Sequence, residues 1–452
     1  MRAESPLVSD KQIDRCFFSW GLVSGLLLAL LLTLLPAKEA VKYPVALVAA
    51  YYFWQQPLRG LYLVLAGLPF IPTAWLGKLL LASAVLAVGR AIWKGKKVLL
   101  PTGVDLPCHA FFILVGLAAV FSVARDSSLS VLPLYGLYLV GFYLAATLPR
   151  PRDVPWLLGG LLLAGALAAL LGLWQYKSGI QTSLSWIDIK QAAAIKTRVF
   201  GPFDNPNIFA EYLTFVLPIA LVLYCTDQRW LGRGVWAAVS GLAATALVLT
   251  FSRGGWLAAV AGVLVLGVLW EPKLLVATAV LVALLPMVAS DQVIQRASSI
   301  GSLEDSSNTF RLSIWAAVLA MIRAYWLTGI GLGTTAFNQV YPHFMLAGTP
   351  AIHSHNLYLQ LALELGLPGL TAFLWLLLAV LRRSFQALPQ LSRRDQGVLA
   401  ALLAALTGFL LHGAVDNVWY SPKLTLLFWL VLGFTVCLGK EADSPAGAAY
   451  NK

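Results

Sequence analysis

Long apolar runs alternate with short polar connections along this chain. Runs such as GLVSGLLLALLLTLLP and LLGGLLLAGALAALLGLW contain no ionisable side chain. Their lengths approach the roughly 20 residues that a helix needs to cross about 30 Å of hydrocarbon. A backbone inside a bilayer must satisfy its own hydrogen bonds, so we predict that these runs are transmembrane helices. The predicted spans are residues 17–36, 42–56, 59–75, 77–93, 106–123, 130–148, 154–174, 207–226, 234–251, 255–270, 273–290, 355–381, 396–414 and 422–439.

This pattern predicts an all-α fold, a polytopic transmembrane bundle of about 12 to 14 spans once one or two re-entrant or merged segments are allowed for. The two longest polar segments are residues 177–206 and 291–354. Within the second, FRLSIWAAVLAMIRAYW repeats apolar residues every three or four positions and places Arg311 and Arg323 on a polar face. That pattern predicts a helix lying along the membrane surface.

We divide the chain into three parts. They are N-terminal transmembrane helices over residues 1–176, a functional region over 177–420 that includes both long loops, and a last span with a polar tail over 421–452.

Composition agrees with a membrane protein: 59% of residues are apolar and only 12% are charged. In soluble proteins, roughly a quarter of all residues are charged. The four cysteines are scattered singly, which favours neither a disulfide scaffold nor a zinc site. The net charge of +12 is compatible with nucleic-acid binding, but most of the basic clusters lie in short connections between spans. We therefore interpret the charge as a topology signal and expect no nucleic-acid partner.

The basic clusters also predict orientation. With a cytoplasmic N-terminus, the clusters at 90–97, 150–152, 229–233, 382–383 and 393–394 all fall inside. Both termini are then cytoplasmic, and segments 177–206 and 291–354 lie outside. The first apolar run is too long for a signal-peptide core, so we expect it to be retained.

Two arginines stand out at the predicted outer face. Arg253 interrupts the apolar stretch TALVLTFSRGGWLAAVAG, where a charge costs several kcal/mol unless it has a partner or faces water. The alternative is a tight turn with an arginine that extends to the surface. Arg198 precedes the turns of RVFGPFDNPNIF, in which Asn205 or Asn207 can cap the next helix. A turn between a loop and a helix explains the prolines and asparagines by itself, but it does not explain Arg198.

The segment AIHSHNLYLQLALELGLPGL opens a span with His353 and His355. A spacing of two does not turn both rings toward one ion on a helix, which favours a single histidine that acts as a base or contacts an anion over a metal pair. Interfacial histidines at a helix start remain the alternative. Asp416 follows His412 by one turn in LHGAVDNVWYSPK, where it could orient a basic residue or, as we favour, cap a helix.

Together, the outer face offers three arginines and one base, namely Arg198, Arg253, Arg311 and His355. The sequence shows no paired carboxylates, no cluster of metal ligands and no phosphate-binding glycine loop. Fixed cations suit an anionic substrate, and a diphosphate leaving group fits because guanidinium groups neutralise its developing charge. We therefore expect neither a metal nor a cofactor.

The sequence resembles the O-antigen ligase and O-antigen polymerase family of bacterial membrane proteins. The resemblance rests on RVFGPFDNPN from Arg198, FSRGG at Arg253, the stretch from NTFRLSIW through GIGLG, and His355-Asn356 followed by Gly366 and Gly369. It covers roughly residues 195–420, whereas the first half agrees only in hydropathy. The histidine and glycine motif is its most specific part.

This resemblance implies a metal-independent, inverting glycosyltransferase of the multi-span, GT-C-like type in the bacterial inner membrane. Its donor would be a glycan on undecaprenyl diphosphate, used on the outer side of that membrane, and its acceptor another glycan or lipid. Arg198 and Arg253 would bind the diphosphate, and His355 would deprotonate or position the acceptor hydroxyl. The predicted substrate contacts are Arg311, Asn356, Asn205, Asn207, His353 and Asp416.

Several functions stay open at this point. A polymerase joins one lipid-linked repeat to another, whereas a ligase transfers the finished chain to a terminal acceptor, and a protein-glycosylating enzyme is a third option. All three use the same donor chemistry. A transporter, such as a bicarbonate carrier, is the alternative from a different class, but it predicts a repeat and a polar site at mid-membrane.

Overall fold

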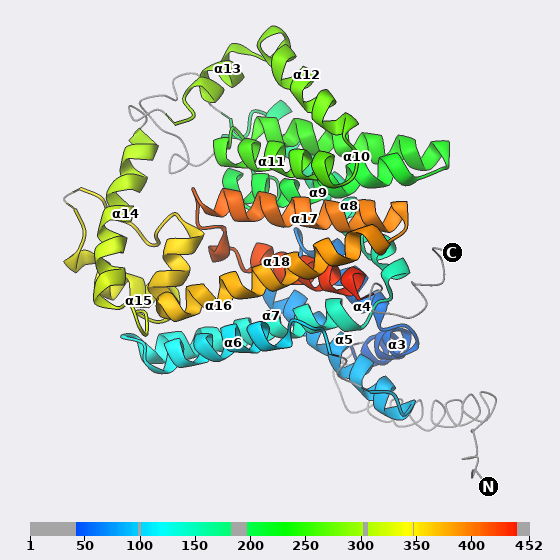
Figure 1. Ribbon diagram of the computed structural model, residues 1–452, viewed down its shortest axis with the longest axis horizontal. Helices are drawn as coiled ribbons and strands as arrows, with labels where there is room; N and C mark the ends of the chain where they lie inside the picture. The colour runs from blue at the N-terminus through cyan, green and yellow to red at the C-terminus, as the bar shows by residue number, and fades with distance from the viewer. Residues whose placement is uncertain (1–41, 98–100, 182–196, 302–305, 347, 441–452) are drawn as a thin grey trace. The chain divides into compact units, whose positions relative to one another are not determined.

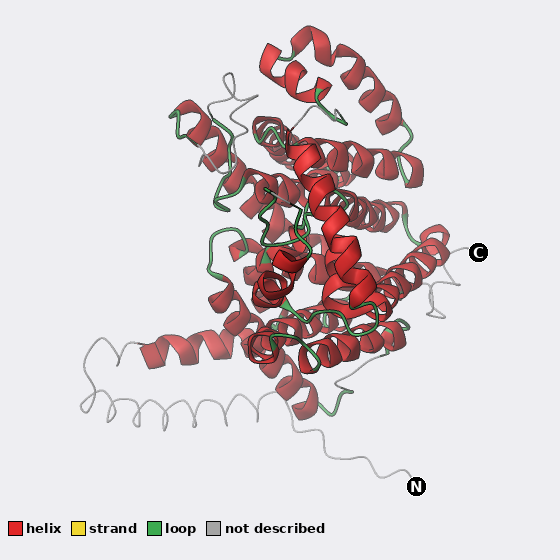
Figure 2. Ribbon diagram, turned by 90° about the vertical axis from the view of Figure 1, so that its left-hand side faces the viewer, coloured by secondary structure: helices red, strands yellow, loops and turns green. Residues whose placement is uncertain are grey.

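The computed structural model describes residues 42–97, 101–181, 197–301, 306–346 and 348–440 (Figure 1). These residues form helices and loops, and no strand occurs among them (Figure 2). The chain divides into two compact units, residues 1–59 and 60–452. The first unit contains α3 (Lys42–Gln55) and the first two residues of the next helix, and the second contains the helices that follow.

The further α-helices, in chain order, are α4 (Leu58–Gly67), α5 (Thr73–Trp93), α6 (Asp105–Val120), α7 (Arg125–Thr147), α8 (Val154–Lys177), α9 (Pro206–Thr226), α10 (Trp230–Leu249), α11 (Arg253–Leu269), α12 (Lys273–Val288), α13 (Asp291–Ser298), α14 (Ser306–Ala324), α15 (Gly333–Val340), α16 (Leu357–Ala387), α17 (Arg393–Gly413) and α18 (Pro422–Gly439). Short 3-10 helices lie at Pro151–Asp153, Tyr341–His343, Leu388–Gln390 and Val418–Tyr420.

Within the described residues, 8 helices are long and apolar enough to cross a membrane. Shorter apolar helices add Leu58–Gly67, Asp105–Val120, Arg253–Leu269 and Lys273–Leu284. The predicted all-helical, polytopic class is confirmed, and the chain is a multi-pass membrane protein. The predicted span 17–36 lies outside the described residues.

One predicted span is wrong. Residues 59–75 do not form one helix, because α4 ends at Gly67 and the next helix begins at Thr73. Pro69 and Pro72 lie in the gap. Proline lacks the N–H that continues a helix and disfavours helical backbone in the residue before it, so two prolines three residues apart break the apolar run.

Helices α9, α17 and α18 lie at the centre of the second unit, with most of their side chains buried. Helix α11 packs against α17 and α9, α16 packs against α6, and α18 packs against α7. Figure 1 shows α11, α17, α16 and α6 running side by side across the view. Gly433 of α18 permits the last contact, since a Cβ there would lie 2.5 Å from the carbonyl oxygen of Phe142. Such small residues allow close helix packing in membranes.

Helix α14 runs across the direction of α16 and α6 at one end of this unit (Figure 1). It lies within the predicted surface segment 291–354. Its buried side chains, among them Ile314, Val318 and Met321, pack with Phe337 of α15 and Leu363 of α16. The predicted helix therefore exists, and its apolar face is covered by neighbouring elements of the protein.

A break within α16 explains the glycines of the most specific motif. Gly366 has φ 71° and ψ 175°, a conformation that is open essentially only to glycine. The break lets the segment before α15 bond to α16: the N–H of Ile330 donates to the Leu363 carbonyl at 2.8 Å, and that of Gly331 donates to the Glu364 carbonyl at 3.1 Å. In return, the N–H of Leu367 donates to the carbonyl of Trp326 at 2.7 Å.

Replacing Gly366 by alanine should therefore destabilise the protein by about 3 kcal/mol or more. The added Cβ would lie 2.4 Å from the carbonyl oxygen of Leu327, on top of the unfavourable backbone angles. Thermal unfolding of the purified protein in detergent measures the effect. Gly136→Ala is the matched control, since that helical position has open space around it. Equal melting temperatures for the two variants would contradict the prediction.

Candidate active site

The loop before α9 holds Arg198 in a fixed position. Gln175 of α8 accepts hydrogen bonds from the backbone N–H groups of Phe200 (3.2 Å) and Gly201 (2.9 Å), and it donates to the Gly201 carbonyl at 2.8 Å. The guanidinium of Arg198 donates from Nε to the carbonyl of Thr250 at 2.8 Å and is 8% exposed. This arginine is therefore held between α8 and the end of α10.

Asn205 and Asn207 have different roles at the start of α9. Asn205 is the N-cap, because its side-chain oxygen accepts from the backbone N–H of Asn207 at 2.8 Å. Asn207 instead uses its side chain to join separate segments: its oxygen accepts from Arg198 at 2.9 Å, and its nitrogen donates to Asp416 at 2.9 Å. The predicted cap is confirmed at Asn205.

Arg253 begins α11 and reaches the segment after α13. Its NH1 donates to the carbonyl (2.8 Å) and the hydroxyl (3.0 Å) of Ser299, and NH2 donates to Asn308 at 3.4 Å. Ser252 caps the helix by accepting from the N–H of Gly255. Arg253 follows a turn, as the alternative interpretation predicted. Its side chain is nevertheless only 9% exposed and has partners within the protein, rather than extending to the surface.

The start of α16 positions His355. Asn356 caps this helix by accepting from the N–H of Leu359 at 2.9 Å, and its side-chain nitrogen donates to the carbonyl of Ala414 at 2.7 Å. His355 has φ 51°, a left-handed conformation uncommon for residues other than glycine, and its N–H donates to Nδ1 of His353 at 3.2 Å. The two histidine rings lie 4.1 Å apart, centroid to centroid.

Asp416 is the centre of the cluster. One carboxylate oxygen lies 3.2 Å from Nδ1 of His355, and the other accepts from Asn207 and lies 4.0 Å from NH2 of Arg311 on α14. The helix that follows, Val418–Tyr420, is preceded by Asn417 and has no side-chain cap bond. Of the two interpretations of Asp416, the structure thus supports the one in which it orients a basic residue, and the favoured capping role is wrong.

Charge keeps Asp416 ionised. Burial alone would raise the pKa of Asp416, but the hydrogen bond with His355 and the positive charge of Arg311 outweigh burial and hold this pKa well below its usual range. An ionised carboxylate only accepts hydrogen bonds, so a neutral His355 bonded to it carries its proton on Nδ1. Its Nε2 is then unprotonated and able to accept a proton.

The site also has an excess of positive charge. Burial, together with the nearby charges of Arg296, Arg253 and Arg311, lowers the pKa of Arg198 to about 9. The charges of these three arginines therefore act on Arg198, which remains cationic at neutral pH. The shared carboxylate of Asp416 cannot neutralise them all, which suits a multiply charged anion.

Sequence reasoning did not identify Arg296. It lies on α13, and its Nε donates to the carbonyl of Phe251 at 3.2 Å. A single arginine in a polar loop carries no distinctive signal. Only the packing of α13 near the start of α11 brings its charge to the site.

A buried ion pair beneath the site was also missed. Glu211 of α9 and His412 of α17 are hydrogen bonded to each other and are almost fully buried. Gly254 makes room for this pair, since a Cβ there would lie 2.6 Å from the His412 ring. The signal was present in the sequence, because Glu211 is the only charged residue of α9, and an ionisable residue within a span is a functional candidate by default.

Acid should destabilise the protein through His353. Burial and the neighbouring charge of His355 lower the pKa of His353 from 6.5 to about 4. Between these values the unfolded chain binds the proton and the folded protein does not, so the free energy of unfolding should fall by about 3 kcal/mol as pH drops from 7 to 4. Thermal unfolding against pH should show a flatter profile for His353→Asn, whereas exposed His343→Asn should match the wild type. Identical slopes for all three proteins would contradict the assignment.

The structure brings together seven of the nine predicted site residues, namely Arg198, Asn207, Arg253, Arg311, His353, His355 and Asp416. The other two, Asn205 and Asn356, use their side-chain oxygens to cap α9 and α16 at the edge of the same cluster. Substrate contact by any of the nine stays a prediction.

Comparison with known proteins supports the resemblance seen in the sequence. A family profile described as O-antigen ligase matches residues 237–374. The matched segment runs from α10 into α16 and contains Arg253, Arg296, Arg311 and His355. No curated protein sequence matches the chain. Residues 237–374 of this membrane protein are therefore similar to the O-antigen ligase family, a glycosyltransferase-type family of enzymes.

Proposed function

We propose that the protein transfers a glycan from a lipid diphosphate, of the undecaprenyl type, to an acceptor hydroxyl at the extracytoplasmic face of a bacterial inner membrane. The observation that carries this proposal is a continuous hydrogen-bonded chain. Arg198 donates to Asn207, Asn207 donates to Asp416, and Asp416 pairs with His355. This chain connects Arg198, which is suited to hold an anion, with His355, which is suited to accept a proton.

The arginines form the donor end of the proposed site. Arg253, Arg296 and Arg311 are close enough to Arg198 for their charges to lower its pKa. When the glycosidic C–O bond breaks, the bonding electrons pass to the diphosphate oxygen. Guanidinium groups stabilise that developing charge with paired N–H donors, which is the contribution that a divalent cation makes in other enzymes. Metal-independent transfer is therefore part of the proposal.

His355 forms the acceptor end. Its Nε2 takes the proton of the acceptor hydroxyl while that oxygen attacks the anomeric carbon, and the ionised Asp416 stabilises the resulting imidazolium. Attack from the side opposite the leaving diphosphate inverts the anomeric configuration. The proton is then on His355, the glycan is on the acceptor oxygen, and the diphosphate leaves with the electrons of the broken C–O bond.

The orientation of the bundle supports an outer site. The start of α9 and the segment directly after α17 contribute Asn207 and Asp416 to the site. The opposite ends of α8, α9 and α17 carry the basic clusters 150–152, 229–233 and 393–394. Because basic connections favour the cytoplasm, the site lies on the other face, as the topology prediction proposed.

The test is reconstitution of the purified protein in liposomes with a glycan on undecaprenyl diphosphate and candidate acceptors, in the presence of a chelator. We expect transfer without added metal and release of undecaprenyl diphosphate. A single product of fixed size indicates a ligase, whereas a ladder of repeats made from donor alone indicates a polymerase. Transport of solute without glycan transfer, unaffected by His355→Ala, would refute the enzyme assignment.

A further inference from the structure

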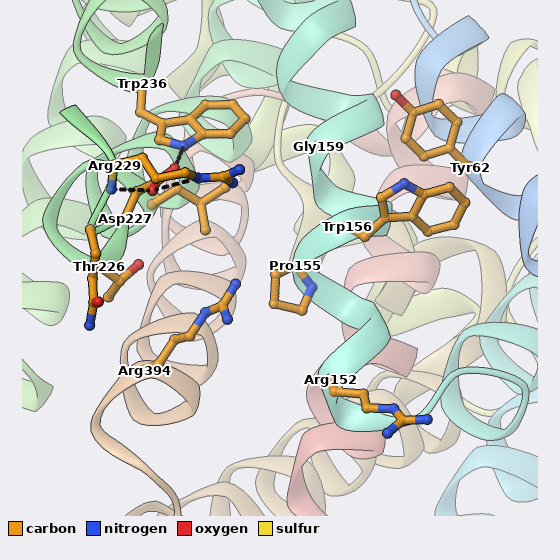
Figure 3. A pocket seen from close by; sticks show the side chains of 12 residues that line it. Tyr62, Arg152, Pro155, Trp156, Gly159, Thr226, Asp227, Arg229, Trp236 and Arg394 are labelled. Carbon is orange, nitrogen blue, oxygen red and sulfur yellow. Dashed lines mark hydrogen bonds and ion pairs between the residues drawn. The ribbon is translucent and has the colours of Figure 1, made fainter. Parts of the chain in front are cut away.

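A cavity of about 770 Å³ lies at the other end of the bundle. It is bounded by the start of α8, the turn between α9 and α10, and the start of α17 (Figure 3). Helix α9 runs from the candidate active site at Pro206 to this cavity at Thr226. Its 21 residues rise about 30 Å, so the cavity is separate from the candidate active site and lies near the opposite membrane surface.

Three arginines, Arg152, Arg229 and Arg394, line this cavity, and one of them is already paired. Asp227 accepts from the backbone N–H of Arg229 at 2.9 Å and lies 3.6 Å from its Nε. Asp227 also accepts from the indole N–H of Trp236 at 3.2 Å.

Among the described residues, the other two arginines have no such partner. Across the described part of the chain, Arg152 and Arg394 have neither a hydrogen bond nor an ion pair through their side chains. Figure 3 shows Arg394 extending from α17 toward Pro155, and Arg152, in the short helix before α8, extending away from Arg394. The cavity thus presents two unneutralised guanidinium groups on facing elements, which suits a bound anion.

Apolar and aromatic surface lies beside these charges. Trp156 stacks on Tyr62 with ring centroids 4.7 Å apart and remains 48% exposed, while Pro155 and Leu223 are buried in the wall. Tryptophan and tyrosine favour the membrane interface, where one edge of the ring contacts lipid and the other contacts water. A small free anion would contact only the arginines. An amphiphile would contact the arginines with its charged headgroup and the aromatic wall with its apolar part.

We propose that this cavity binds the headgroup of an anionic phospholipid from the cytoplasmic leaflet. Arg394 holds the phosphodiester, the exposed side chain of Arg152 turns toward it on binding, and the glycerol and first acyl carbons lie against Trp156 and Pro155. Basic pockets between transmembrane helices at the cytoplasmic surface recognise lipids in this way. The proposal is independent of glycan transfer at the other end of the bundle.

The full-length protein, purified in detergent, should retain phosphatidylglycerol in native mass spectrometry and bind it about tenfold more tightly than phosphatidylcholine. The double variant Arg152→Ala with Arg394→Ala should lose about tenfold in affinity for phosphatidylglycerol. The matched control is Arg150→Ala with Arg233→Ala, which removes the same charge from the same end of the bundle but from residues outside the cavity. This control should bind within twofold of the wild type.

Two results would overturn the proposal. Equal losses in the two double variants would show that general surface charge, rather than the cavity, attracts the lipid. Displacement of phosphatidylglycerol by inorganic phosphate at equal concentration would show that the cavity is a free-anion site. Unfolding temperatures of both double variants in detergent confirm that each is folded before affinities are compared.

Discussion

Replacing His355 by alanine or asparagine should lower the rate of glycan transfer by about a hundred- to ten-thousandfold, the usual contribution of a positioned base. The ring is held by Asp416 at 3.2 Å and by its own left-handed backbone, and neither alanine nor asparagine can supply a base at that position. Asparagine is the sharper variant because it tolerates that backbone conformation better than alanine. Rates measured in liposomes with saturating donor isolate the loss to the transfer step.

The partner variant separates the roles of the two residues. Asp416→Asn keeps a side chain of the same size but removes the charge that stabilises the imidazolium, and in a catalytic histidine–carboxylate pair the loss of the carboxylate costs roughly a hundredfold less than the loss of the histidine. We therefore expect a smaller loss than for His355→Asn. Binding of undecaprenyl diphosphate should be unchanged in His355→Asn, whereas Asp416→Asn should not weaken it, since that variant removes a negative charge beside the arginines. A His355→Asn enzyme within tenfold of the wild type would contradict the assignment of the base.

Changing Arg253 should weaken binding of the lipid diphosphate donor. Arg253→Ala removes a charged donor from a site 9% exposed, and a lost hydrogen bond to a charged group costs about 1.5 to 3 kcal/mol, or roughly 10- to 150-fold. The affinity for undecaprenyl diphosphate and the transfer rate should both fall. Arg253→Lys keeps the charge but cannot supply two parallel N–H groups, so it should recover little of the loss.

Arg253 also contacts the protein, which calls for a matched control. Its NH1 donates to the carbonyl and to the hydroxyl of Ser299. Ser299→Ala removes only the hydroxyl and should leave donor affinity within about threefold of the wild type. Equal losses in Ser299→Ala and Arg253→Ala would indicate that Arg253 acts by holding the segment after α13. Full activity of Arg253→Lys would show that charge alone suffices.

Local sequence signals were sufficient for much of the fold. Hydropathy and length predicted most of the helices because a span is encoded within about 20 consecutive residues. Capping at Asn205 and the turn before Arg253 were readable for the same reason, since each depends on neighbours a few positions away. The break at Pro69 and Pro72 was also local, but it lay inside a run whose hydropathy masked it.

By itself, the sequence determined that this is a helical membrane protein with Arg198, Arg253 and His355 as candidate site residues, because an ionisable residue beside an apolar run stands out locally. Only the tertiary structure decided what those residues contact. The bond between His355 and Asp416 spans 61 positions, and that between Asn207 and Asp416 spans 209. The packing of α9, α11, α16 and α17 brings these residues together, and no local pattern records which helix ends meet.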